Sequence, residues 1–95
     1  MKDKKEIDFV EVPIDNDEAI FTTGVVCKLL SIPQHVLKQL DLEGIVKPPR
    51  KRGRMRLYSK RELKKIQHCW KYMNEDGVKI GGLKVILKME EENKG

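Results

Sequence analysis

The stretch that most constrains the fold is residues 47–61, with the sequence KPPRKRGRMRLYSKR. It contains eight Lys or Arg and no acidic residue, so its charges repel one another unless something anionic lies opposite. Gly53 lies near its middle, where a tight turn needs a residue that tolerates a positive φ. Met55, Leu57 and Tyr58 follow, and their side chains suit a half-buried strand. The stretch therefore predicts a β-hairpin that carries positive charge, which we call the wing.

A helix start follows the wing directly. Ser59 and Glu62 have the Ser-x-x-Glu spacing of a capping box, in which each side chain accepts a hydrogen bond from the other residue's backbone N–H. This start predicts a helix over residues 59–75 and anchors the wing to a folded domain. A solvated basic loop and a localisation-type basic run are the alternative interpretations of the same charges.

Charge is unevenly distributed along the 95 residues, whose net charge is +5. Residues 1–20 hold three Lys and seven Asp or Glu, a net of −4, so the remainder carries +9. We predict an acidic arm over residues 1–19, flexible or partly extended, a domain over 20–92 and a tail over 93–95. The sequence IDFVEVPI at 7–14 fits either a short edge strand or a disordered arm that orders on a partner. This pattern is typical of an anion-binding domain, whose anion can be nucleic acid, a membrane surface or an acidic protein.

The sequence argues against several other classes of protein. Cys27 and Cys69 lie far apart, and His35 and His68 do not complete a metal-ligand pattern with them, so we expect reduced thiols, no metal and no cofactor. No apolar run is long enough to span a membrane, and charged residues follow Met1 where a signal peptide would be apolar, which predicts a cytoplasmic protein. No carboxylate pair, nucleophile–base set or phosphate-binding glycine loop occurs, which argues against an enzyme.

Two short helices are predicted ahead of the wing. Thr22 or Thr23 can cap the first, and Pro33 separates it from the second. The second runs from about Pro33 to Glu43 and ends at Gly44. Its outward face offers the polar side chains Gln34, His35, Lys38 and Gln39. Two short helices joined by a tight turn are typical of a helix-turn-helix, whose second helix can enter a major groove; two ordinary core helices are the alternative.

A last helix is predicted over residues 83–92, after Gly81 and Gly82. Val85 and Met89, four residues apart, form an apolar strip beside its core-facing side. The strip is a possible dimer contact.

Four motifs between Phe21 and Glu91 carry a resemblance to a known family: TTGVVCKLLSI, HVLKQLDLEGIVKPPR, RLYSKREL and NEDGVKIGGLKVIL. They resemble the MerR-type winged helix-turn-helix regulators, and LKQLDLEGIVKP with EDGVKIGGLKVILKMEE is most similar to the HspR heat-shock repressor subgroup. The resemblance implies a mostly α fold with about four helices and a short two-stranded β-hairpin wing. It also implies transcription regulators that bind inverted repeats of double-stranded DNA as dimers.

The resemblance implies roles by position. Lys38 stands where the family usually has Arg in its recognition helix, and Gln39 occurs in the HspR-like pattern. Leu40 departs from a tyrosine that many members carry. Arg56 and Tyr58 match the pattern at the wing exit and carry over as phosphate contacts.

We therefore predict a transcription regulator, a repressor by resemblance, that binds double-stranded DNA sequence-specifically in the cytoplasm at the nucleoid. The base-reading candidates are Gln34, His35, Lys38 and Gln39. The phosphate-contact candidates are Thr22, Thr23, Arg50, Lys51, Arg52, Arg54, Arg56 and Tyr58. The alternatives are an excisionase-like architectural DNA-binding factor and an RNA- or protein-binding adaptor that uses the basic face.

The predicted partners follow from the same resemblance. We expect an inverted-repeat duplex. We also expect either a monomer or a weak homodimer, formed through Val85 and Met89 or through the N-terminal arm, because the long dimerisation helix of the family would lie beyond the last residue, Gly95. Neither a membrane partner nor a small-molecule effector site is expected.

Overall fold

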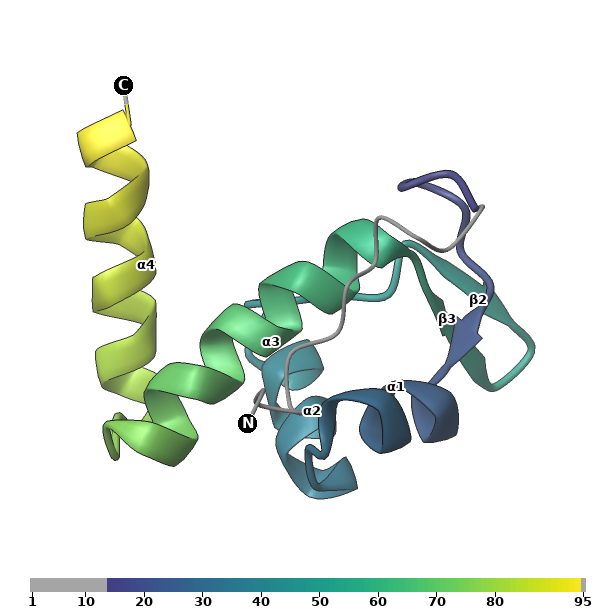
Figure 1. Ribbon diagram of the computed structural model, residues 1–95, viewed down its shortest axis with the longest axis horizontal. Coiled ribbons are helices and arrows are strands. Elements are labelled where there is room, and N and C mark those ends of the chain that lie inside the picture. The colour runs from purple at the N-terminus through teal and green to yellow at the C-terminus, as the bar shows by residue number, and fades with distance from the viewer. Residues whose placement is uncertain (1–13, 95) are drawn as a thin grey trace, which may run out of the picture.

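The computed structural model describes residues 14–94, which form four helices and a small antiparallel sheet that lies at one end of the molecule (Figure 1). The elements in chain order are β1 (Phe21–Thr22), α1 (Thr23–Leu30), α2 (Gln34–Leu42), β2 (Arg50–Arg52), β3 (Met55–Tyr58), α3 (Lys60–Glu75) and α4 (Ile80–Lys94). The mostly α winged helix-turn-helix that the sequence predicts is confirmed. The proposed strand at residues 7–14 lies outside the described residues except for Ile14.

The helix-turn-helix is built from α1 and α2. The Thr22 hydroxyl accepts a hydrogen bond from the backbone N–H of Val25 at 3.3 Å and so caps α1. Ser31 ends α1 with a left-handed φ of 53°, which turns the chain sharply toward α2. Pro33 is the residue just before α2, where its missing N–H costs nothing. Gly44, at φ +73°, follows the end of α2 as a C′ glycine.

The sheet has the strand order β1-β3-β2, with both pairs antiparallel. The hairpin β2–β3 is the predicted wing, and Gly53 at φ +62° opens its two-residue turn, as a type II′ turn requires. The third strand, β1, extends the predicted two-stranded hairpin: Phe21 pairs with Tyr58, and the Ile20 N–H donates to the Tyr58 carbonyl at 3.1 Å. A strand of two residues is too short to show alternation, so the sequence did not reveal it.

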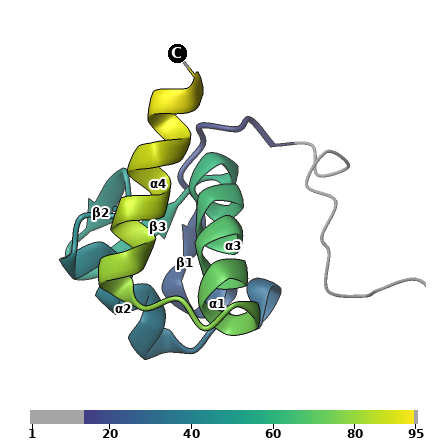
Figure 2. The ribbon, with the colours of Figure 1, turned by 90° about the vertical axis from the view of Figure 1, so that its left-hand side faces the viewer.

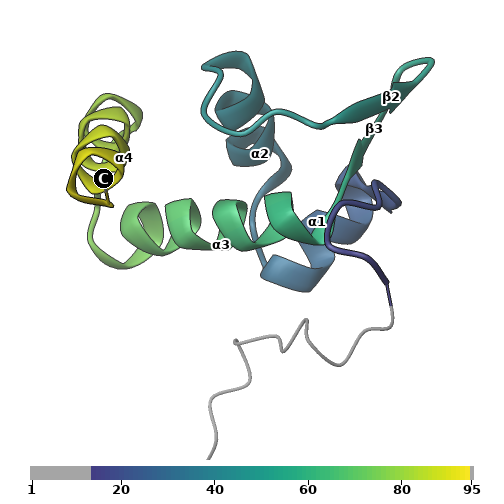
Figure 3. The ribbon, with the colours of Figure 1, turned by 90° about the horizontal axis from the view of Figure 1, so that it is seen from above.

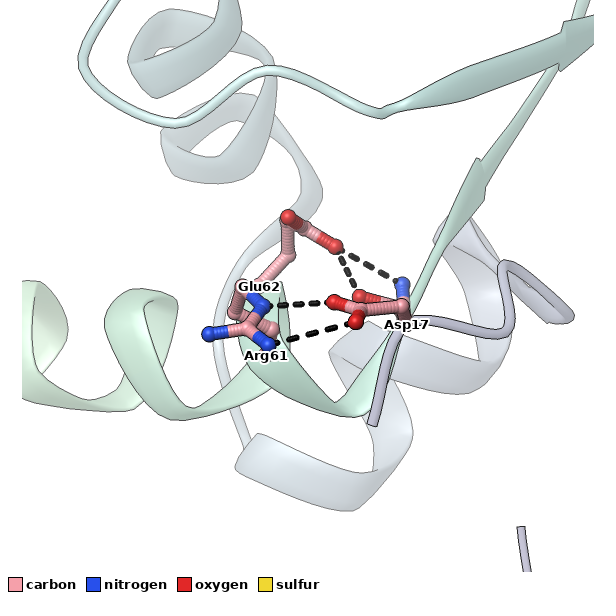
Figure 4. Close-up of polar contacts among 4 residues, drawn as sticks. Asp17, Arg61 and Glu62 are labelled. Atoms are coloured by element: carbon pink, nitrogen blue, oxygen red, sulfur yellow. Dashed lines mark hydrogen bonds and ion pairs between the residues drawn. The ribbon is translucent and has the colours of Figure 1, made fainter. Parts of the chain in front are cut away.

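The core lies where α1, α2 and α3 meet the sheet. Its most deeply buried side chains are Val26, Leu37, Leu40, Tyr58, Leu63, Ile66, Cys69 and Leu83. The predicted capping box of α3 is present: the Ser59 N–H donates to Glu62 Oε1 at 3.1 Å (Figure 4). Trp70 is only half-buried and packs against this core.

The start of α4 differs from the predicted residue 83. The helix begins at Ile80 and contains Gly81 and Gly82, both exposed. Glycine lowers helix propensity by roughly 1 kcal/mol relative to alanine, which is why the pair indicates a loop. Packing overrides that preference here, because Leu83 is fully buried and Ile80 packs on the core, so the first turn is held from one side.

The other parts of the domain are arranged along the length of α3. The wing lies near its first turn and α4 near its last, and α2 lies between them on the same side of α3 (Figure 3). Viewed from the side of α4, the helices α1 and α2 lie at the end of the molecule away from the C-terminus (Figure 2). Across residues 14–94, none of the helices is long and apolar enough to cross a membrane.

Candidate nucleic-acid interface

The outward face of α2 is polar and exposed. Val36, Leu37 and Leu40 point into the core, with no more than 6% of each exposed. The four base-reading candidates are all exposed: Gln34, His35, Lys38 and Gln39. Because residues four apart lie one above the other on a helix, these side chains form two adjacent rows on one face. The structure thus brings together all four side chains that the sequence singled out here.

The tip of the wing, residues 50–54, is a second exposed surface. Arg50, Lys51, Arg52 and Arg54 are exposed, and none of their side chains forms a hydrogen bond or ion pair with any residue from 14 to 94. The tight turn at Gly53 places these cations close together on a short hairpin. Such a concentration of charge attracts an anionic backbone and repels other cations.

Arg56, expected to contact phosphate, points instead toward α2. Its Nε donates to Asp41 Oδ2 at 2.7 Å, and the two side chains are 31% and 10% exposed. The carboxylate therefore occupies the Nε–H donor of the guanidinium in a charge-assisted hydrogen bond. The sequence indicates neither the partner nor the direction, because Asp41 lies 15 residues away on another element.

Tyr58, which the resemblance assigns to a phosphate contact, has a side chain that is fully buried in the core. Its hydroxyl lies near Thr23 but forms no hydrogen bond of good geometry with any residue that the structure describes. Burial raises the pKa of Tyr58 to about 12, and the Asp41 carboxylate contributes in the same direction. The phenol is therefore neutral and inaccessible to a phosphate at neutral pH.

Thr22 and Thr23 begin α1, as the sequence predicts, and both are half-buried. The Thr22 hydroxyl is occupied as the N-cap, so a phosphate would meet backbone N–H groups of the first turn rather than that hydroxyl.

An ion pair that the sequence did not indicate joins the acidic segment to α3. Arg61 donates from Nε to Asp17 Oδ1 at 2.6 Å and from a terminal nitrogen to Oδ2 at 3.3 Å (Figure 4). The Arg61 backbone N–H also donates to the Asn16 carbonyl at 3.1 Å. The hydrogen bond from Arg61 holds the pKa of Asp17 below its usual 3.8. These residues are 44 apart, so no local pattern could have found the pair.

Three further contacts join α4 to the rest of the domain. Glu90 of α4 accepts a hydrogen bond from the Tyr72 hydroxyl at 2.6 Å and lies 3.0 Å from His68 Nε2. Lys84 pairs with Glu43, at the end of α2, at 2.8 Å. The contact with Glu90 raises the pKa of Tyr72.

The predicted apolar strip of α4 is exposed. Val85 and Met89 are 58% and 56% exposed, on a side of the helix that no described element covers. The strip is thus available to a partner, although nothing in the structure occupies it.

The two thiols are free. Cys69 is fully buried, and burial raises its pKa to about 11, while burial also raises the pKa of the half-buried Cys27. Among residues 14–94, no group of His, Cys, Asp or Glu gathers in a way that could hold a metal ion.

A short helix-turn-helix, an exposed polar second helix and a basic hairpin beside it together define a winged helix-turn-helix domain. The model of the MerR helix-turn-helix family of regulatory proteins matches residues 21–90 of the sequence. The chain belongs to that family.

The chain is also similar in sequence to a bacterial heat shock protein. The heat shock protein HspR of Streptomyces coelicolor is 27% identical over 79 residues, which make up 83% of this chain and 52% of the relative. The chain therefore spans about half the length of this curated relative.

Proposed function

We propose that this protein is a transcription regulator that binds double-stranded DNA sequence-specifically, with α2 in the major groove and the wing tip on flanking phosphates. The observation that carries the proposal is the pairing of two exposed surfaces on one domain. One is the polar face of α2, and the other is the wing tip, whose four cations have no partner among the described residues. A base-reading element beside a phosphate-binding element is what sequence-specific DNA recognition requires.

On this proposal the side chains have distinct roles. Lys38 and Gln39 are long enough to donate to base edges, and Gln34 and His35 read from the start of the same helix. The wing tip supplies affinity without sequence information, because phosphates are alike along the duplex. Repression is proposed from the resemblance of the sequence to the HspR subgroup of heat-shock repressors, and the proposed place of action is the nucleoid in the cytoplasm.

The proposed dimer uses the exposed strip of α4. A second copy of the chain that covers Val85 and Met89 would place two α2 helices on an inverted repeat. Sedimentation of the parent and of a Val85→Glu, Met89→Glu variant tests this arrangement. A tight dimer that survives both changes would rule out the strip as the contact.

The test of the function is selection of bound duplexes from a random DNA pool at near-physiological salt. We expect an enriched sequence, and Lys38→Ala or Gln39→Ala should lose discrimination by about 1–3 kcal/mol for each lost base contact. Binding without enrichment would favour the architectural alternative, and a preference for structured RNA or an acidic protein would favour the adaptor. Lys64→Ala, on the exposed side of α3, removes the same charge away from α2 and is the matched control.

A further inference from the structure

The Asp41–Arg56 ion pair joins the helix proposed to read bases to the hairpin proposed to hold phosphates. Asp41 lies in the last turn of α2, and Arg56 lies in the middle of β3. Their contact is short, at 2.7 Å between Nε and Oδ2, and Asp41 is shielded from solvent with 10% of its side chain exposed. A charge-assisted hydrogen bond of this kind is stronger than a neutral one and is directional.

The pair links α2 and β3 directly, and each of these elements also packs against α1. Both α2 and β3 pack against α1 more extensively than they pack against each other. The segment that joins α2 to the first strand of the wing, residues 43–49, has no regular secondary structure. The angle between α2 and the wing therefore depends on packing against α1 and the core, in which Ile45 and Val46 of this segment are buried, and on this polar contact.

The position of Lys51 gives the same carboxylate a second effect, within the wing itself. Lys51 lies directly opposite Arg56 on the neighbouring strand. Like charges at opposite positions destabilise an antiparallel pair. The Asp41 carboxylate, bound to Arg56, offsets that repulsion and draws the hairpin toward α2.

We propose that Asp41 and Arg56 are a positioning pair, which holds the wing at the angle to α2 that lets both contact one DNA duplex at once. This role rests on the proposed function. Neither residue needs to touch DNA for it. Arg56, which the sequence alone assigns to a phosphate, acts through Asp41 on the arrangement of the two surfaces.

Long-range electrostatics and positioning make opposite predictions for Asp41. A carboxylate beside a DNA-binding face repels phosphates, so its removal should strengthen binding if only charge matters. Removal also frees Arg56 for a phosphate. If the pair positions the wing, its removal weakens binding instead, because the wing and α2 no longer fit the same duplex.

The experiment uses a duplex recovered by the selection above and the same duplex cut back so that the flanks under the wing are missing. The double variant Asp41→Ala, Arg56→Gln keeps the parent's net charge and removes the pair. We expect its Kd for the full duplex to rise about tenfold, with little change for the cut-back duplex. Asp41→Ala alone should also bind the full duplex more weakly than the parent.

The control is Glu43→Ala, which removes the same charge two residues further along and breaks an ion pair that leads to α4, not to the wing. It should bind both duplexes at least as tightly as the parent. Binding of the full duplex by the double variant as tightly as by the parent would overturn the positioning role. An equal loss on both duplexes would assign the pair to the folding of α2 and would also overturn it.

These measurements distinguish a failure of the proposed function from a failure of the positioning role of Asp41 and Arg56. A parent that binds no duplex would overturn the proposed function and this role with it. A parent that selects a sequence, together with Asp41→Ala that binds it more tightly, would keep the proposed function and overturn the positioning pair alone. Thermal unfolding of each free variant shows that the compared proteins are folded.

Discussion

The tip of the wing, with four cations in residues 50–54, and the base that leads from it into α3, with three in residues 56–61, are both basic in sequence but differ in the structure. At the tip, residues 50–54, the cations are exposed and have no partner within residues 14–94. At the base, residues 56–61, Arg56 pairs with Asp41 and Arg61 with Asp17, and Lys60 is 5% exposed. Charge density alone therefore does not identify a binding surface. The cations without a partner among the described residues are those at the exposed tip of the hairpin.

The largest effect expected from this comparison is at the tip. We predict that a variant with all four tip cations changed to Gln binds DNA on the order of a hundredfold more weakly near physiological salt. The slope of log K against log salt should flatten by up to about 3.6, since each phosphate contact contributes about 0.9. Titrations at several salt concentrations measure both quantities. An unchanged slope would show that the tip does not contact phosphates.

Substitutions at the base should act mainly on the stability of the fold. Arg56→Ala leaves the shielded Asp41 carboxylate without its cation, and we expect the free energy of unfolding to fall by about 1–2 kcal/mol, reduced by the partial exposure of Arg56. Urea unfolding gives the value. Arg52→Ala, the matched change at the tip, should stay within about 0.5 kcal/mol of the parent. Equal losses in the two variants would remove the distinction between tip and base.

Tyr58 lies in the base and differs from the residues of the tip in being fully buried. Tyr58→Phe removes a buried hydroxyl that forms no good hydrogen bond with a described residue. We expect the free energy of unfolding to change by less than about 1 kcal/mol, toward greater stability, and the Kd for DNA to stay the same. A variant that is as stable as the parent but binds DNA more weakly would return Tyr58 to the phosphate contacts.

The smallest effect concerns Asp17 and Arg61 at the surface. The pKa of Asp17 is lowered in the folded protein, so its contact stabilises the fold above pH 3.8 and is lost as the pH falls through the lowered pKa. An NMR titration of the Asp17 carboxyl should show this low pKa in the parent. In Arg61→Gln it should return toward 3.8. If the two proteins titrate alike, Arg61 is not the cause.

Local features of the sequence were enough to predict much of this domain. The turn at Gly53, the capping box of Ser59 and the end of α2 at Gly44 each depend on neighbours within a few residues. The outward face of α2 follows from the helical period once its buried side is known. The helical period also explains why Val85 and Met89, four residues apart, are both exposed on one side of α4.

The tertiary structure alone decided which cations are available. Whether Arg56 or Arg61 is free depends on partners 15 and 44 residues away, and sequence spacing carries no record of such distances. Tyr58 became a core residue because β1 and α1 close over the base of the hairpin, which a pattern of alternating residues cannot show. The start of α4 at Ile80 was likewise set by packing on the core. Long-range packing therefore divided one basic stretch into an exposed tip and a base bound to the domain.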